Sequence, residues 1–112
     1  MIVSAAHVRL VLTTAGSHEE AERIAGALVD EHLAACVNLI PGLTSVYRWQ
    51  GAVETANEVL LIIKTTSENL DRVEAELRRM HSYELPEFLV LHPGTGSQEY
   101  LDWLLQSAKS NS

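Results

Sequence analysis

The chain has 112 residues, of which 15 are acidic and 8 are basic, and its net charge at pH 7 is −7. This length fits one domain, so we predict a single domain over 1–112, with a core over about 8–106 and a polar tail over 107–112. An acidic chain disfavours a phosphate backbone as partner and favours cations, although solubility alone also explains the charge. One cysteine excludes an internal disulfide, and no apolar run approaches the ~20 residues of a membrane span. We therefore expect a cytoplasmic protein with no nucleic-acid partner and no membrane partner.

The first half of the chain predicts a strand, a helix and two more strands. Residues 8–14 predict the first strand, and Ser17 with Glu20 has the capping-box spacing that begins a helix. The inward stripe of this helix is expected to be Ala21, Ile24, Ala25, Leu28 and Val29. The next two strands, 34–40 and 46–50, are expected to be joined by a turn at Pro41-Gly42. In the second of them Tyr47 and Trp49 share one side, because side chains alternate along a strand.

The second half repeats this order of elements. A turn is expected over 51–57 and an apolar strand over 58–66, after which Ser67 is expected to cap a helix. Residues 81–86 break that helix, a strand follows over 87–92, and Ser97 begins a short final helix. The side chains expected to face inward are Leu70, Val73, Leu77 and Met80 in the first helix and Tyr100, Leu101, Leu104 and Leu105 in the second.

The two halves predict the fold class. Shifting the chain by about 49 positions superposes Ala21 on Leu70 and His32 on His81, so a strand-helix-strand unit occurs twice. Two such units predict an α+β, ferredoxin-like split βαβ fold, with an antiparallel sheet and both helices on one face. Both alternating sets of side chains in 59–63 are apolar. Because a bare apolar face is rare on a monomer, we expect the chain to self-associate through the sheet.

Three segments carry a resemblance to a known family: LAACVNLIPGLTSVYRWQG over 33–51, EVLLIIKTT over 58–66 and HSYELPE over 81–87. Over about 8–105 the chain closely resembles the CutA divalent-cation tolerance proteins. The resemblance implies a ferredoxin-like subunit and a tight homotrimer, similar to that of the P-II signalling proteins, whose sheets pack edge to edge around a threefold axis. It also implies a cytoplasmic location in bacteria and a role in tolerance to copper and other divalent cations.

Cys36 and His81 are the candidate metal ligands. A deprotonated Cys36 thiol suits copper or zinc, but a lone cysteine in a strand is also a small buried hydrophobe. His81 follows a helix, where its imidazole either binds a metal or caps the last carbonyls. The resemblance implies a copper site made by a cysteine in the first strand and two adjacent histidines after the second helix. Those positions hold Thr13, Met80 and His81 here, so we predict weak copper binding, to which a Met80 thioether would contribute for Cu(I).

The resemblance also implies a cleft between subunits, with Cys36 nearby. The residues expected to line it are Lys64, Tyr47, Trp49, Glu54, Glu58, Tyr83, Glu84 and Glu87. Lys64 either pairs with a carboxylate or receives an anion at the edge of this cleft.

The sequence favours binding over catalysis. It contains no G-x-S-x-G elbow, P-loop or G-x-G-x-x-G motif, so we expect no enzyme. The leading hypothesis is a homotrimer that binds copper and other divalent cations in the response to metal ions, with no obligatory cofactor. One alternative is a P-II-like trimeric sensor that binds a small anionic effector in the cleft between subunits, and another is a trimeric scaffold for protein partners.

Overall fold

A computed structural model describes residues 1–109 of the chain. The elements, in chain order, are β1 Ile2–Ser4, β2 Val8–Ala15, α1 His18–Asp30, β3 Cys36–Trp49, β4 Ala52–Thr66, the 3₁₀ helix η1 Ser67–Asn69, α2 Leu70–Met80, β5 Leu89–Leu91, β6 Thr95–Ser97 and α3 Gln98–Ser107. No helix in this part of the chain is long and apolar enough to cross a membrane.

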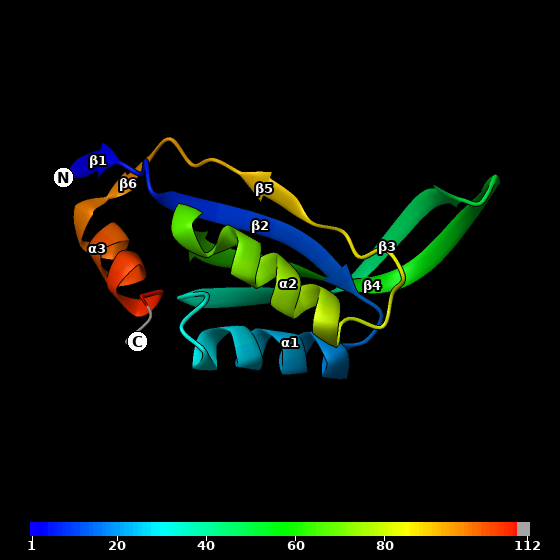
Figure 1. Ribbon diagram of the computed structural model, residues 1–112. Coiled ribbons are helices and arrows are strands. Elements are labelled where there is room, and N and C mark those ends of the chain that lie inside the picture. Colours follow the sequence, from blue (N-terminus) through cyan, green and yellow to red (C-terminus); the bar gives the residue numbers. More distant parts are fainter. Residues whose placement is uncertain (110–112) are drawn as a thin grey trace.

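The larger sheet is antiparallel and has the strand order β3-β4-β2-β5, while β1 pairs with β6 in a small separate sheet. Figure 1 shows α1 and α2 on one face of the larger sheet and α3 beside β1 and β6, at the end where the N-terminus lies. The order β2-α1-β3-β4-α2-β5 is two strand-helix-strand units. The predicted α+β fold with an antiparallel sheet and both helices on one face is confirmed.

Helix α1 begins where the sequence predicts. The Ser17 hydroxyl accepts a hydrogen bond from the Glu20 N–H at 3.1 Å, which satisfies one of the free donors of the first turn. The predicted stripe is buried except at Val29, which is 41 % exposed. That prediction was wrong because the helix ends one residue later, at Asp30, and Leu33, whose N–H donates to the Leu28 carbonyl, takes the inward position instead.

The expected cap of α2 was also wrong. Ser67 begins η1, and α2 starts at Leu70 after Asn69. The Asn69 amide donates to the carbonyls of Leu33 and Ala108 at 3.2 and 2.7 Å, so it ties this helix to two other segments rather than capping its own first turn.

Helix α3 is capped by Ser97, as predicted, through a bond from the Tyr100 N–H at 3.2 Å. Leu101 and Leu104 are buried, but Tyr100 is 43 % exposed and the prediction that it faces inward was wrong. Its ring lies outside the core against Trp103, at a centroid distance of 5.5 Å.

Strands β3 and β4 form one long hairpin that extends beyond the helices (Figure 1). The predicted turn at Pro41-Gly42 is instead a β-bulge inside β3, where the register shifts between Ile40 and Leu43. Pro41 has no N–H to pair, and Gly42 has a φ of +77°, a conformation that glycine adopts without strain. The predicted turn over 51–57 is also wrong, since β4 already begins at Ala52. Strand β5 is shorter than the predicted 87–92.

Two apolar clusters hold the chain together. The larger lies between the sheet and helices α1 and α2, and the smaller packs α3 against the beginning of β2. Ala108 is buried in the smaller cluster. Of the other residues of the predicted polar tail over 107–112, Ser107 ends α3 and 110–112 lie outside the described residues.

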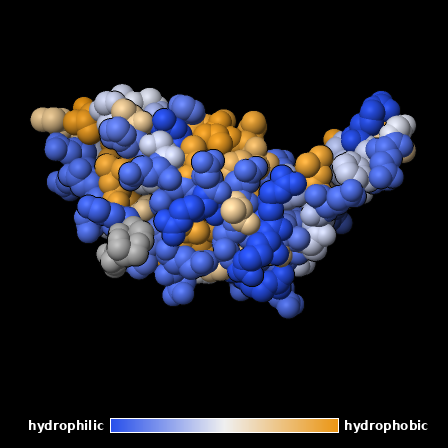
Figure 2. Space-filling view, in the orientation of Figure 1, coloured by the Kyte–Doolittle hydropathy of each residue, from blue (hydrophilic) through white to orange (hydrophobic). Residues whose placement is uncertain are grey.

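On the other face of the larger sheet, α3 packs against the end at Val8 and Lys64, and no helix of the described chain lies over the rest. Register pairing places a continuous set of residues on this face: Leu10, Leu12, Leu60, Ile62, Leu89 and Leu91, together with Ile40, Asn38, Cys36 and Lys64. Leu89 and Leu91 are 55 % and 40 % exposed. Figure 2 shows hydrophilic residues over α1 and α2, and hydrophobic residues gathered at the β5 edge.

Candidate binding cleft

The β3–β4 hairpin builds one wall of a cleft by its register. Tyr47 pairs with Glu54, Trp49 with Ala52 and Leu43 with Glu58, so the two aromatic side chains and both glutamates share one face. The bulge at 41–42 makes this possible, because one extra residue reverses the alternation of β3 relative to β4. Tyr47 and Trp49 share one side of β3, as predicted, and the bulge puts the carboxylates of Glu54 and Glu58 on that side.

The loop after α2 builds the opposite wall, and His81 anchors it. The His81 ring is buried; its Nδ1 accepts from the Tyr83 N–H at 3.0 Å and its Nε2 lies 2.6 Å from the Thr14 carbonyl. A ring that accepts at Nδ1 carries its proton on Nε2, so Nε2 donates to Thr14. Gly16 lets the loop come close, because a Cβ there would lie 3.1 Å from the Tyr83 hydroxyl.

Tyr83 joins the two walls. Its hydroxyl donates to Glu58 Oε2 at 2.8 Å. Burial and this hydrogen bond raise the pKa of Tyr83 above its ordinary value of 10.0, since both disfavour the phenolate beside a carboxylate. Tyr83 therefore stays a neutral donor through the physiological pH range.

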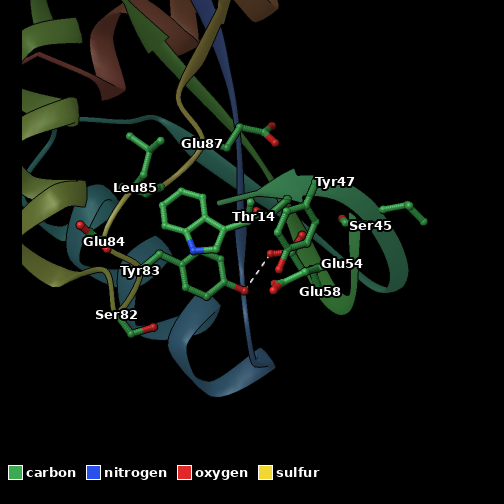
Figure 3. A pocket seen from close by; sticks show the side chains of 13 residues that line it. Thr14, Ser45, Tyr47, Glu54, Glu58, Ser82, Tyr83, Glu84, Leu85 and Glu87 are labelled. Atoms are coloured by element: carbon green, nitrogen blue, oxygen red, sulfur yellow. Dashed lines mark hydrogen bonds between the residues drawn. The ribbon is translucent and has the colours of Figure 1, made fainter. Parts of the chain in front are cut away.

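The cleft between these walls has a volume of about 970 Å³ and is open to solvent. Figure 3 shows the carboxylates of Glu54 and Glu58 between the rings of Tyr47 and Tyr83, with Glu84 and Glu87 at its margins. The lining residues are Thr14, Ser45, Val46, Tyr47, Trp49, Glu54, Glu58, Ser82, Tyr83, Glu84, Leu85, Pro86 and Glu87. Within 1–109, no lysine, arginine or histidine lines it.

The structure brings together seven of the eight predicted cleft residues and places Lys64 elsewhere. Lys64 pairs with Cys36 and Leu10 across the strands, and its ammonium donates to the Tyr100 hydroxyl at 3.3 Å. Thr14, beside the cleft, pairs with Leu60, four residues along β4 from Lys64. At about 3.3 Å per residue this separates Lys64 and Cys36 from the cleft end of the sheet by roughly 13 Å.

The four predicted metal ligands do not form one group. Cys36 lies on the uncovered sheet face near Lys64. Thr13 is fully buried on the helix side, where its hydroxyl has no partner, and Met80 packs against the same core. Both nitrogens of His81 are engaged by backbone groups. Across residues 1–109, no three histidine, cysteine or acidic side chains are placed to hold one metal ion.

Several residues of the cleft region have no signal of their own in the sequence. The cleft lining also includes Ser45, Ser82 and Leu85. The HSYELPE segment contains Ser82 and Leu85, whereas nothing in the sequence indicates Ser45. Glu20 was missed as well: it is 8 % exposed, and its Oε1 has no hydrogen-bond partner and lies 3.9 Å from His81 Nδ1. The only signal for Glu20 in the sequence is its position three residues after Ser17, which predicts a capping role alone.

Known proteins are similar to this chain over most of its length. Residues 9–107 match the profile of a family described as CutA1 divalent ion tolerance protein. The divalent-cation tolerance protein CutA of Thermus thermophilus is 48 % identical over 98 residues, which is 88 % of this chain and 95 % of that protein. The chloroplastic CutA 1 of rice is 41 % identical over 91 % of this chain, and the chain spans 58 % of that protein's length. The structure of CutA from Synechococcus elongatus superposes with a TM-score of 0.92 at 43 % identity, over 97 % of this chain and 96 % of that one.

Proposed function

This chain belongs to the CutA1 family of divalent ion tolerance proteins, and from that premise we propose that it is a homotrimer that binds divalent cations without turning over a substrate. The observation that carries the cation part is the cleft, which has four glutamates in its lining and, within the described residues, no basic side chain. A cavity with one sign of charge raises the local concentration of the opposite ion.

The carboxylates of Glu54 and Glu58 are the proposed centre of cation binding. They lie on one face of the hairpin, and oxygen ligands suit hard divalent cations. Because no three suitable side chains of residues 1–109 converge on one metal-sized point, the proposal requires water or a second subunit to complete the ligand set. The predicted copper set of Cys36, His81, Met80 and Thr13 has weaker support, since the two nitrogens of His81 already have partners.

The trimer part of the proposal is supported by the uncovered face of the sheet. Leu12, Leu60 and Ile62 occupy adjacent positions there, and a contiguous apolar patch of this kind marks an interaction surface. A second copy of the same chain offers the same apolar face, and closed homo-oligomers bury such patches.

The two alternative functions have less support. A small anionic effector needs a positive group in the cleft, and Lys64 lies outside its lining. No observation on residues 1–109 favours a protein scaffold over the other two functions. The cytoplasm stays our expected location, although two plant relatives are named as chloroplastic and the solved Archaeoglobus fulgidus protein is named as periplasmic.

Calorimetry and light scattering test the proposal. We expect a particle of three times 12.4 kDa that binds Mn²⁺, Zn²⁺ or Cu²⁺ saturably. The double variant Glu54→Gln/Glu58→Gln should lose this binding, and Glu99→Gln, an exposed glutamate on α3, should keep it. A monomeric particle would refute the trimer part of the proposal. Metal binding that the double variant retains would refute the assignment of the site to Glu54 and Glu58. Binding retained there but lost in Cys36→Ala would move the site to the thiol.

A further inference from the structure

We propose that the cleft takes an organic ammonium ion, such as a polyamine, between its aromatic rings and its carboxylates. This inference rests on the proposed cation binding and names the chemical class of a ligand for the same cleft. The groups that carry it are Glu54, Glu58, Tyr47, Trp49 and Tyr83.

Glu58 is the first reason. It is 8 % exposed, yet its carboxylate forms no ion pair with any basic side chain of residues 1–109. Only its Oε2 has a hydrogen-bond donor, Tyr83; within the same residues, its other oxygen has none. That second oxygen faces the open cleft, so this otherwise buried carboxylate, which has no counter-ion among the described residues, is placed to receive a positive group from outside the chain.

The aromatic rings are the second reason. Tyr47 and Trp49 stand on the same face of the hairpin as Glu54 and Glu58, and Tyr83 comes from the opposite wall. A cation over an aromatic face within about 6 Å of the centroid is attracted by the ring quadrupole, and rings with carboxylates are the side chains that recognise organic ammonium groups. A bare metal ion gains little from such rings because it needs oxygen, nitrogen or sulfur ligands.

The size and spread of the cleft are the third reason. Its volume of about 970 Å³ is that of a site for a small organic molecule. Its carboxylates do not converge in threes on one point within 1–109. Carboxylates spread along a cavity match ammonium groups that are several bonds apart, as in a polyamine.

The test is a calorimetric titration of the full-length protein with spermidine in phosphate buffer, with 1,8-octanediol as an uncharged control. We expect saturable spermidine binding and none of the diol. Glu58→Gln, which keeps the shape but removes the charge, should weaken binding about tenfold or more. Tyr47→Leu should weaken it about threefold to tenfold, and Tyr47→Phe, which keeps the ring, should bind like the parent. Glu99→Gln is the matched charge control.

Fluorescence places the ligand. In a Trp103→Phe background the remaining tryptophan is Trp49, so spermidine should change its emission with the same midpoint as the calorimetric curve. Absence of binding, equal binding of the diol, or binding that neither Glu58→Gln nor Tyr47→Leu weakens would overturn the inference. If Glu58→Gln fails to fold, the Tyr47 pair decides. Mn²⁺ titration of the same variants in a phosphate-free buffer separates the two proposals: metal binding without spermidine binding removes only this one, and the reverse removes only the divalent-cation function.

Discussion

The two faces of β4 have nearly the same composition and opposite surroundings. Leu61 and Ile63 are fully buried under α1 and α2, whereas Leu60 and Ile62 alternate with them on the face that no helix covers. Hydrophobic side chains on the first face are stabilised within the chain. Those on the second are half-buried within the chain, and they gain the rest of that stabilisation only when another molecule covers them. An apolar pattern in the sequence therefore identifies a surface that must be covered, but it does not identify the segment or molecule that covers it.

The largest effect is expected on the covered face. Leu61→Lys places a charge where Leu61 is 0 % exposed, so we expect a loss of about 4 kcal/mol or more, which is comparable to the whole stability of a small domain. Circular dichroism should show a chain that is mostly unfolded at 25 °C. Leu61→Met, which conserves volume, should melt close to the parent. A Leu61→Lys protein with the parental melting curve would contradict the assignment of this face.

The same substitution one residue along should separate folding from assembly. In Ile62→Lys the side chain can extend into solvent, so we expect the helical signal to be retained and the particle mass to fall from trimer to monomer. Light scattering measures the mass, and Gln106→Lys on the exposed side of α3 is the control for added charge. A trimer that persists in Ile62→Lys would show that this face is not the interface.

The fold was predictable because its main signals are local. The cap at Ser17, the stripe of α1 and the apolar run 58–66 each follow from neighbouring residues, and together they fix an antiparallel sheet with helices on one face. The two errors in the β3–β4 hairpin have a common cause. Pro41-Gly42 and 51–57 have turn composition, but long-range pairing between β3 and β4 continues through both, which a local pattern does not report.

The cleft was partly predictable, but from the family resemblance rather than from local patterns. The resemblance to a family collected the aromatic and acidic residues that the hairpin and the 82–87 loop bring together. The position of Lys64 was not predictable from spacing, because it depends on register: Lys64 pairs with Leu10 and Cys36, whereas Leu60 pairs with Thr14 beside the cleft. The engagement of both His81 nitrogens by backbone groups also required coordinates.

A third prediction concerns His81, which connects the covered core to the cleft. His81→Ala removes the bonds to Thr14 and Tyr83, so we expect a loss of about 1–3 kcal/mol in the free energy of unfolding by urea. Because these bonds make His81 a structural residue, Cu²⁺ affinity in chelator competition should change less than threefold, about 0.7 kcal/mol. A large loss of copper affinity with unchanged stability would instead make His81 a ligand.

Tyr83 gives a smaller effect that depends on pH. Its pKa is raised in the folded protein, so between the ordinary value of 10.0 and the folded value the unfolded chain loses a proton that the native chain keeps. The stability from this group is complete below pH 10 and falls as the pH rises above it. Tyr83→Phe should lack this alkaline loss while keeping its ring packing, which urea denaturation at pH 8 and pH 11 measures. Parallel curves for the two proteins would contradict the assignment.

The smallest effect is expected at Lys64, at the far end of the uncovered face. Its ammonium lies 5.6 Å from the Tyr100 centroid and 3.3 Å from its hydroxyl in an exposed position, contacts worth about 1 kcal/mol or less. Lys64→Met should therefore melt near the parent and bind cleft cations with the parental affinity, and Lys64→Arg should do the same. If Lys64→Met alone abolishes cleft binding, Lys64 must reach the cleft of a neighbouring copy. The two regions that are separate within one chain would then form a single site across the assembly, and an anionic ligand would regain support.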